Sequence, residues 1–310
     1  MGGMAPGKAR ALAKADLEAL LDGNAGNVAL VLGNGINRYG AAGVNSWDAL
    51  LMRIAADCGV GLAAVPHGTT LTEFYDVLSL KTAGRTGALA AEFCKLMAEW
   101  RPLGHHRAVT GWAARHAVPV LTTNFDEVLS DAADAKFLLP RGLPFSDFYP
   151  WNARFAHVLA DNPGSAFGIW HINGMARYKR SIRLGLTDYM GSVQRARAMF
   201  YRGDKQLFRG GNRDDWEGAA GWLDLVFHKP LLFLGLSLEE NEVFLRWLLI
   251  ERARYFRKFP HRRQPAWYVS THNPRDARET GKHFFLEAVG VTCLRADGYD
   301  RIWGDAAWER

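Results

Sequence analysis

Short apolar runs alternate along the chain with longer segments whose apolar residues recur at helical spacing. The clearest apolar runs lie at residues 27–33, 118–121, 167–174, 231–238, 266–270 and 290–294. Each is short and rich in aliphatic or aromatic side chains, which favours a buried strand. Because strand and helix keep alternating, the pattern predicts an α/β fold, with a mostly parallel sheet covered by helices on both faces.

The segments between these runs predict helices and two insertions. Ser46 is a good N-cap for a helix that follows it,. We expect further helices over residues 71–81, 88–100, 105–116, 214–227 and 274–289, and from Thr187 or Asp188 to about Tyr201,. Glu239, Glu240 and Glu242 should begin another helix. Residues 60–117 therefore form a helical insertion. Residues 136–165 are rich in Pro and aromatic residues without periodicity, which predicts an irregular insertion or lid.

The pattern divides the chain into a leader with a short helix, residues 1–26, and a single domain, residues 27–310. Residues 1–20 carry basic side chains but no continuous apolar stretch, so they do not resemble a secretory signal,. No apolar run approaches the roughly 18 residues that span a bilayer. We expect a cytoplasmic protein.

Composition and charge exclude only a few classes of function and of metal site. The formal net charge is +6, but the basic residues are dispersed, with the densest groups at residues 252–263 and 177–183. Direct nucleic-acid binding is therefore a weak hypothesis. The three cysteines are far apart and no C-x-x-C occurs, which excludes a zinc ribbon and makes a disulfide framework improbable,. His105 and His106 are adjacent, so they do not share a helix face, and we expect both to be solvated.

Polar side chains follow four of the predicted strands. Thr122, Thr123, Asn124 and Asp126 follow one strand, and His171 ends another within His-Ile-Asn-Gly. In an open α/β sheet ligands bind outside the carboxyl ends of the strands, which makes these residues candidates for a site. The alternative for Asn124 is a helix N-cap, for Asp126 a favourable charge in a first helical turn, and for His171 a satisfied histidine at a strand end.

Glycine-rich turns follow the other two of these strands. The first is Gly33-Asn34-Gly35-Ile36-Asn37, and the second is Gly235-Leu236-Ser237. A strand followed by a Gly-rich turn is how nucleotide-binding folds present backbone N–H groups to phosphate. The first turn is not the dehydrogenase fingerprint, because Arg38 stands where that motif has its third glycine,.

The four motifs in this order resemble the sirtuin family, and more closely the sirtuin-like NAD hydrolases of bacterial antiphage defence. The G-N-G-I-N loop, the T-T-N-F-D segment, the H-I-N-G turn and the G-L-S-L turn match in kind and order over residues 27–294. The resemblance implies a Rossmann-like fold. Protein-deacetylating sirtuins carry a four-cysteine zinc module before the last turn, and this chain has no cysteine between Cys94 and Cys293. NAD breakdown without a peptide acceptor is the activity that this departure favours.

The resemblance also implies roles for individual residues. His171 is the base acting on a ribose hydroxyl or a water, and Asn124 holds the nicotinamide ribose or the attacking water. Asp126 fixes Asn124, the pyridinium side or a backbone N–H. The residues expected to bind NAD as substrate are Gly33, Asn34, Gly35 and Asn37 at the diphosphate, Thr123, and Gly235 and Ser237 at the adenine-side ribose. No metal is expected. In NAD the nicotinamide leaves as a neutral base from a cationic pyridinium, so no general acid is needed to protonate it.

The expected activity is hydrolysis of NAD to nicotinamide and ADP-ribose by an NAD-depleting effector. Because such an enzyme would poison its host, we expect control by assembly, as a homo-oligomer or with a separate subunit. In related systems such partners resemble HerA-type ATPases, short Argonautes or nucleotide sensors. The alternatives are an NAD-dependent protein deacylase or ADP-ribosyl transferase, and a non-catalytic module that binds NAD or ADP-ribose.

Overall fold

A computed structural model describes residues 12–41, 45–82, 86–140, 152–240, 242–271 and 277–310. Its centre is one sheet of nine strands in the order β1-β9-β8-β7-β2-β3-β6-β5-β4. The strands are β1 (Ala13–Lys14), β2 (Ala29–Leu32), β3 (Pro119–Thr122), β4 (Lys136–Leu138), β5 (Arg154–Ala156), β6 (Gly168–His171), β7 (Leu231–Leu234), β8 (Ala266–Ser270) and β9 (Thr292–Arg295). All neighbours are parallel except the β6–β5 and β5–β4 pairs.

The order of the six central strands determines where a ligand can bind. Counted along the chain, β2, β3, β6, β7, β8 and β9 are strands one to six, and they lie in the order 3-2-1-4-5-6. This is the order of dinucleotide-binding sheets, whose binding crevice opens at the carboxyl edge where the chain direction reverses. Here the reversal lies between β2 and β7, so the turns after these two strands flank the crevice. The predicted Rossmann-like fold is confirmed.

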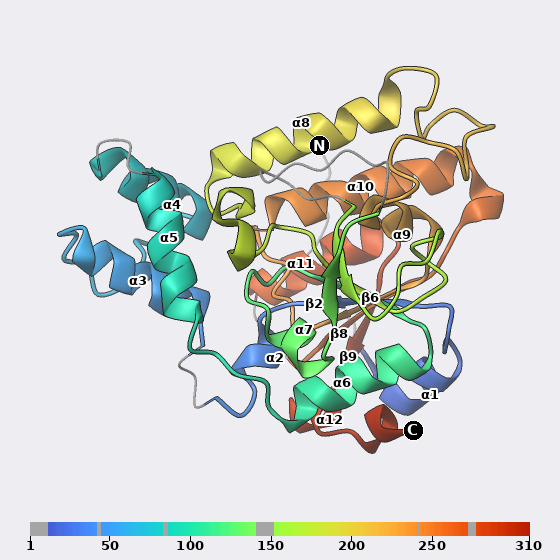
Figure 1. Cartoon of the computed structure of the whole chain (residues 1–310), viewed down its shortest axis with the longest axis horizontal. Helices are drawn as coiled ribbons and strands as arrows, with labels where there is room; N and C mark the ends of the chain where they lie inside the picture. The colour runs from blue at the N-terminus through green and yellow to red at the C-terminus, as the bar shows by residue number, and fades with distance from the viewer. Residues whose placement is uncertain (1–11, 42–44, 83–85, 141–151, 241, 272–276) are drawn as a thin grey trace, which may run out of the picture.

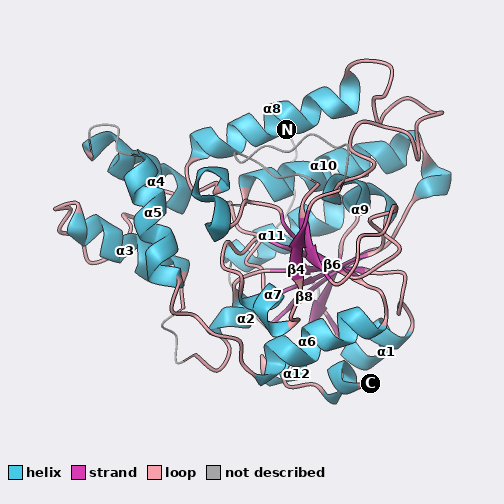
Figure 2. Cartoon of the chain, in the orientation of Figure 1, coloured by secondary structure: helices cyan, strands magenta, loops and turns pink. Residues whose placement is uncertain are grey.

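Helices cover both faces of the sheet and a separate group stands beside it (Figures 1 and 2). The helices are α1 (Leu17–Asp22), α2 (Gly35–Arg38), α3 (Trp47–Asp57), α4 (Leu71–Lys81), α5 (Thr86–Met97), α6 (Gly104–Arg115), α7 (Val128–Ala132), α8 (Leu186–Tyr201), α9 (Trp222–His228), α10 (Val243–Lys258), α11 (Ala277–Ala288) and α12 (Asp300–Trp303), with 3-10 turns η1 (Ala176–Ser181), η2 (Pro260–Arg262) and η3 (Ala306–Glu309). Among the described residues, no helix is long and apolar enough to cross a bilayer.

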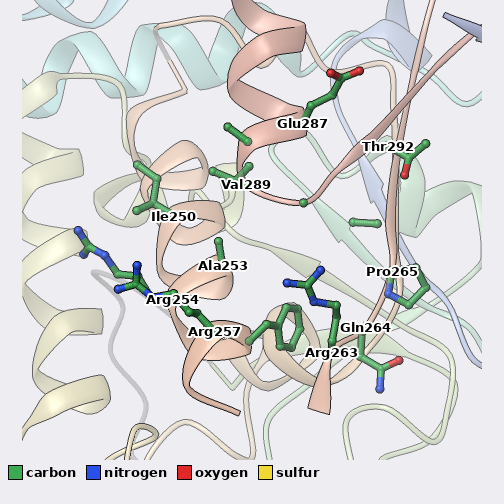
Figure 3. A pocket seen from close by; sticks show the side chains of 14 residues that line it. Ile250, Ala253, Arg254, Arg257, Arg263, Gln264, Pro265, Glu287, Val289 and Thr292 are labelled. Carbon is green, nitrogen blue, oxygen red and sulfur yellow. The ribbon is translucent and has the colours of Figure 1, made fainter. Parts of the chain in front are cut away.

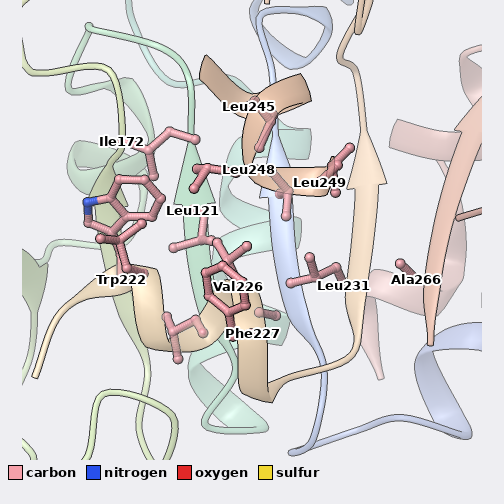
Figure 4. Packing of buried hydrophobic residues seen from close by; sticks show 14 of the residues in the cluster. Leu121, Ile172, Trp222, Val226, Phe227, Leu231, Leu245, Leu248, Leu249 and Ala266 are labelled. Carbon is pink, nitrogen blue, oxygen red and sulfur yellow. The ribbon is translucent and has the colours of Figure 1, made fainter. Parts of the chain in front are cut away.

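Alternate residues of each central strand feed two different cores. In β2, Ala29 and Val31 pack on the face covered by α8 to α11, whereas Leu30 and Leu32 pack on the face covered by α1, α6 and α12. Figure 4 shows the first of these cores, in which residues of α9 and α10 pack against β3 and β7. Both faces are apolar because a parallel sheet is buried on both sides, which explains the continuous apolar runs in the sequence.

The helical insertion has a core of its own that reaches the carboxyl edge of the sheet. Buried residues of α3, α4 and α5 cluster with Phe125, which follows β3. Phe125 packs against Trp47, with ring centroids 4.4 Å apart, and against Phe93 at 5.9 Å. Phe125 therefore attaches the insertion to the polar segment that follows β3.

Most of the predicted elements are present, and α4 and β8 have the predicted limits. Ser46 caps α3 as expected, with its hydroxyl accepting the Ala49 N–H at 3.1 Å. Helix α8 begins a residue or two before the predicted caps, and Asp188 accepts the Gly185 N–H at 3.2 Å from within the first turn.

Two sequence predictions need correction. Residues 136–138 and 154–156 are not irregular but form β4 and β5, which extend the sheet through a Phe137–Phe155 pair; residues 141–151 lie outside the described part. Strands of three residues show no periodicity, so the pattern missed them. Residues 214–221 are not helical, because Gly218 and Gly221 interrupt the segment and α9 begins at Trp222. In residues 12–26, the described part of the leader, β1 pairs with β9.

Candidate functional site

The four motifs lie together at the carboxyl edge of the sheet. The strands are in register, with Leu32 beside Thr122 and Leu234, and Thr122 beside His171. The segments that follow these strands therefore start side by side, although they are far apart in the sequence. This edge includes the β2–β7 reversal, which is where a dinucleotide-binding sheet holds its ligand.

The segment after β3 is held by its threonines and presents the amide of Asn124. The Thr122 hydroxyl donates to the Leu32 carbonyl at 3.0 Å and accepts the Asn124 N–H at 3.1 Å. The Asn124 amide donates at 3.4 Å to the Gly33 carbonyl of the first glycine turn. Asn124 does not cap α7, whose N-cap is Glu127. Its Oδ1 atom is buried and accepts no hydrogen bond from any described residue.

His171 lies next to this amide, and its backbone contact fixes the form of its ring. Nδ1 lies 2.8 Å from the Asn124 carbonyl, so this nitrogen carries the hydrogen and donates it, which leaves Nε2 with its lone pair,. Burial lowers the pKa of His171 to about 4, although the bond to Asn124 acts in the opposite direction. The ring is therefore neutral at neutral pH. Nε2 is buried and has no hydrogen-bond partner in the part of the chain that the structure describes.

Asp126 connects the segment after β3 to the first glycine turn. Its carboxylate accepts the Val128 N–H at 3.1 Å and the Asn37 side-chain amide at 2.8 Å. Burial raises the pKa of Asp126 to about 6, and these two hydrogen bonds limit the rise. The Asp126 carboxylate therefore has one of the roles expected from the sequence, which is to hold a backbone N–H. It also orients the Asn37 side chain.

Asn37 is the centre of a buried polar network that involves an unexpected histidine. Its amide also donates to Asn34 Oδ1 at 3.0 Å, and its Oδ1 lies 3.1 Å from Nε2 of His106. His106 Nδ1 accepts the Leu103 N–H at 3.1 Å, so Nε2 carries the hydrogen and donates it to Asn37,. All hydrogen-bonding atoms of the Asn37 side chain are therefore engaged within the protein, and its side chain positions the loop.

The prediction that His105 and His106 are solvated is wrong. His106 is buried, and burial lowers its pKa to about 3. His105 Nε2 lies 2.8 Å from the Ile36 carbonyl, so both rings reach the first glycine turn from the start of α6. The position of both histidines in the first turn of a helix was a signal in the sequence, because a polar side chain there can form hydrogen bonds with groups outside the helix. Asn45 was also missed; its amide donates to the Asn37 carbonyl at 3.3 Å.

Backbone contact between the two glycine turns explains the glycines. A Cβ added at Gly35 would lie 2.6 Å from the Gly235 Cα atom, and one added at Gly33 would lie 2.6 Å from the Gly235 oxygen. The Gly35 N–H donates to that oxygen at 2.8 Å. Gly235 itself has a φ of +67°, a left-handed conformation that favours glycine,. The two turns on either side of the β2–β7 reversal therefore form one unit.

The remaining predicted binding residues differ in exposure. Asn34 is half-buried and donates to the Asn45 carbonyl at 2.8 Å, whereas Thr123 is buried and its N–H donates to Leu32 at 3.1 Å. Ser237 is exposed, and its carbonyl accepts the Tyr268 hydroxyl at 3.4 Å.

A hollow of about 350 Å³ borders Asp126 between α5, α7 and η1. Among the described residues, no group of three or more His, Cys, Asp or Glu side chains is arranged to hold a metal.

A comparison with models of known protein families shows which family the chain belongs to. Residues 118–294, more than half of the chain, match the family model described as the SIR2-like domain. The chain belongs to the SIR2-like family. SIR2-like domains are typically NAD-dependent enzymes that use NAD as substrate, so membership indicates an NAD-related activity. No curated protein matches the chain. The matched region contains the motifs after β3, β6 and β7, and the fold brings the first glycine turn, which precedes the region, against them.

Proposed function

We propose that this SIR2-like protein is an NAD glycohydrolase that cleaves the nicotinamide–ribose bond and releases nicotinamide and ADP-ribose. One observation carries the proposal. Asn124 Oδ1 and His171 Nε2 are buried at the carboxyl edge of the sheet, and neither is hydrogen-bonded to a described residue. Buried polar atoms are nearly always satisfied, so two unsatisfied acceptors on adjacent segments indicate a place where a polar substrate and a water are held.

The chemistry needs a base but no general acid. As the C1–N bond of the nicotinamide ribose breaks, its electron pair passes to the pyridinium nitrogen, and nicotinamide leaves as a neutral molecule. The oxygen of a water bonds to C1 of the ribose while His171 Nε2 takes one of its protons and later returns it to solvent. The sum is NAD⁺ and water giving ADP-ribose, nicotinamide and a proton. Glycosidases with poorer leaving groups use two carboxylates, one of them an acid.

His171 is suited to this role because its ring stays neutral and oriented. The pKa of about 4 keeps Nε2 unprotonated at neutral pH, and the bond from Nδ1 to the Asn124 carbonyl prevents the ring from flipping,. The same contact joins His171 directly to the backbone of Asn124. Asn124 Oδ1 is available to accept a hydrogen bond from a ribose hydroxyl or from the attacking water,.

The paired glycine turns are the proposed diphosphate site. Gly33 and Gly35 let the turns after β2 and β7 meet, and the first of these turns leads into the short helix α2,. Asn37, Asp126 and His106 hold the shape of this turn through buried hydrogen bonds. The exposed Ser237 hydroxyl is the proposed contact for the adenine-side ribose.

An NAD hydrolase that acts without restraint would deplete its own cell. We therefore propose that activity depends on assembly, as a homo-oligomer or with a separate subunit such as a HerA-type ATPase, a short Argonaute or a nucleotide sensor, and that the biological role is NAD depletion in antiphage defence. What supports this is the resemblance of the motifs and the absence of a four-cysteine module from the sequence.

The test is nicotinamide release from NAD across a range of protein concentrations, for wild type, His171→Ala and Asn124→Ala. Two substitutions serve as matched controls. His157→Ala removes an exposed histidine that also contacts a backbone carbonyl, at 2.8 Å. Asn212→Ala removes a half-buried asparagine with two backbone acceptors. We expect loss of roughly 100-fold or more in the site variants, the usual minimum for a general base, and near-native rates in the controls.

Three outcomes would contradict the proposal. Native rates in His171→Ala would remove the assigned base. Turnover only in the presence of an acylated peptide would indicate a deacylase or transferase. NAD binding without nicotinamide release at any concentration, with the co-purifying partner included, would indicate a binding module.

A further inference from the structure

A buried tyrosine of the neighbouring strand β8 holds the turn that follows β7. The Tyr268 hydroxyl donates to the Leu236 carbonyl at 3.0 Å, and the Ser237 carbonyl lies 3.4 Å from the same hydroxyl. Because one hydroxyl lies within reach of two successive carbonyls, it fixes the orientation of both peptide planes. The fold therefore sets the backbone of a turn that the proposed function places at the dinucleotide.

An arginine of α10 holds the next carbonyl of this turn. Nη1 of Arg246 donates to the Leu238 carbonyl at 2.9 Å, and the guanidinium lies 4.0 Å from the ring centroid of Phe285 in α11. Leu238 is buried and has a φ of +47°, a left-handed conformation that a leucine keeps only where its surroundings hold it,. Arg246 therefore fixes a strained residue of the turn, and Phe285 orients Arg246.

Fixing these carbonyls also sets the direction of the N–H groups that follow them. The described residues contain no cis peptide bond, so each C=O points opposite to the N–H of the next residue,. The N–H groups of Ser237, Leu238 and Glu239 therefore point away from the side chains that hold the carbonyls. None of these three N–H groups donates to a residue that the structure describes. Successive N–H groups without a partner are a means by which turns bind anions.

The acidic residues after the turn are partly compensated, so they do not keep an anion away from it. Arg278 of α11 pairs with Glu239 at 3.0 Å and with Glu240 at 3.1 Å. Burial raises the pKa of Glu242 to about 7, and the nearby charge of Glu239 acts in the same direction. An arginine and a partly protonated carboxyl group thus reduce the negative charge of the segment.

We propose that Tyr268 and Arg246 are positioning residues for NAD binding. They hold the peptide planes of the turn after β7 so that its N–H groups donate to phosphate oxygens of the dinucleotide. The inference rests on the proposed function, which places the diphosphate at the paired glycine turns and the adenine-side ribose at Ser237. Both residues act through backbone atoms, so their loss weakens binding and leaves Asn124 and His171 in place.

An arginine beyond the other end of α10 provides a matched control for Arg246. Arg262 is half-buried like Arg246, and it donates to the Gly210 carbonyl at 2.6 Å. Its guanidinium lies 4.5 Å from the ring centroid of Phe259. This end of the helix is at the amino edge of the sheet, where Figure 3 shows Arg257 beside a hollow of about 810 Å³. Arg262 therefore makes the same kinds of contact as Arg246, but far from the candidate site.

Tyr255 is the matched control for Tyr268. It is buried in α10, and its hydroxyl lies 3.0 Å from Nε2 of His228 and accepts Nη1 of Arg262 at 2.9 Å. Replacing either tyrosine by phenylalanine removes only a hydroxyl group. Both variants thus lose buried hydrogen bonds, but only the variant of Tyr268 loses its contact with the turn.

The test combines calorimetric titration with ADP-ribose and steady-state kinetics of nicotinamide release from NAD. ADP-ribose has the diphosphate of NAD but no nicotinamide bond, so its affinity is measured whether or not the protein hydrolyses NAD. The variants are Tyr268→Phe, Arg246→Met and the charge-retaining Arg246→Lys, and the controls are Tyr255→Phe and Arg262→Met. Urea midpoints report the stability of each protein.

We expect Tyr268→Phe and Arg246→Met to bind ADP-ribose at least about tenfold more weakly than wild type, the effect of losing roughly one hydrogen bond to a charged group. KM for NAD should rise by a similar factor while kcat stays unchanged, because the interaction is made equally in the ground state and the transition state. Arg246→Lys should recover part of the affinity. Both controls should bind ADP-ribose as wild type does, even where their urea midpoints fall as far.

Wild-type affinity in both Tyr268→Phe and Arg246→Met, equal weakening in the controls, or a fall in kcat at unchanged KM would overturn the inference. Absence of ADP-ribose binding by wild type would overturn it together with the proposed function. If wild type released no nicotinamide but the variants lost ADP-ribose affinity as expected, the hydrolase would be refuted and the positioning role supported.

Discussion

Replacing Asn37 by alanine would test whether the buried network supports the first glycine turn. The substitution removes the donor to Asp126 at 2.8 Å, the donor to Asn34 at 3.0 Å and the acceptor for His106 at 3.1 Å. Asp126, His106 and Asn37 are all buried, so water does not replace these contacts freely. The Asp126 carboxylate would keep only the Val128 N–H, and the His106 N–H would have no acceptor.

The expected loss of stability follows from these broken hydrogen bonds. A hydrogen bond to a charged group contributes about 1.5 to 3 kcal/mol, and an unsatisfied buried donor costs about 1 to 3 kcal/mol. Because the groups share one network, the losses do not simply add, and we expect about 3 to 5 kcal/mol less stability at pH 8. The effect should depend on pH. The pKa of Asp126 is about 6 in the folded protein against 3.8 for the free group.

The sign of the pH dependence follows from that raised pKa. Ionised Asp126 weakens folding, so the contribution of this residue to stability is fully present below pH 3.8 and is lost as pH rises through about 6,. Removing Asn37 raises the pKa further and deepens this loss. The difference between wild type and variant should therefore be larger at pH 8 than at pH 5, by about 1 to 2 kcal/mol, roughly one unit of pKa.

Urea unfolding followed by tryptophan fluorescence at pH 5 and pH 8 measures this difference. Asn212→Ala is the control, because Asn212 is only half-buried and also donates two hydrogen bonds, to the Asp204 and Gln206 carbonyls. It should cost about 1 kcal/mol or less at both pH values. A loss below 1 kcal/mol in Asn37→Ala at both pH values, or a loss independent of pH, would refute the role given to the network.

Two further predictions follow from the site. The pKa of His171 is 6.5 for the free side chain but about 4 in the folded protein, so the contribution of this residue to stability is complete above pH 6.5 and falls as pH drops toward 4,. Between pH 7 and pH 5 the His171→Leu variant should therefore lose less stability than wild type, as measured by urea titration. An equal loss in the two proteins would contradict the lowered pKa. Gly35→Ala places a Cβ 2.6 Å from the Gly235 Cα atom and should separate the two turns, abolish nicotinamide release and cost roughly 2 kcal/mol, the cost of overpacking,. Gly191→Ala in α8, where the added Cβ meets nothing within 4 Å, is its control and should be neutral or slightly stabilising; equal behaviour of the two would argue against close contact between the turns.

The sequence alone determined the elements that depend on local pattern. The apolar runs specified the six central strands, and the helical spacing specified α4 within its observed limits. Ser46 indicated the start of α3 because an N-cap bonds to its own helix,. The order of polar motifs likewise indicated the family and the edge of the sheet where the candidate site lies, because the parallel arrangement brings the ends of these strands to one edge.

Tertiary structure decided how those motifs are held. The bond between Asn37 and Asp126 joins residues 89 positions apart, and His106 reaches Asn37 across 69 positions. No local pattern encodes such contacts, because they depend on how α6, α7 and the strands pack. The same holds for β4 and β5, which are too short to show a period and exist because β6 offers an edge to pair with. Local spacing therefore determined which elements form, and long-range packing determined which side chains became buried partners.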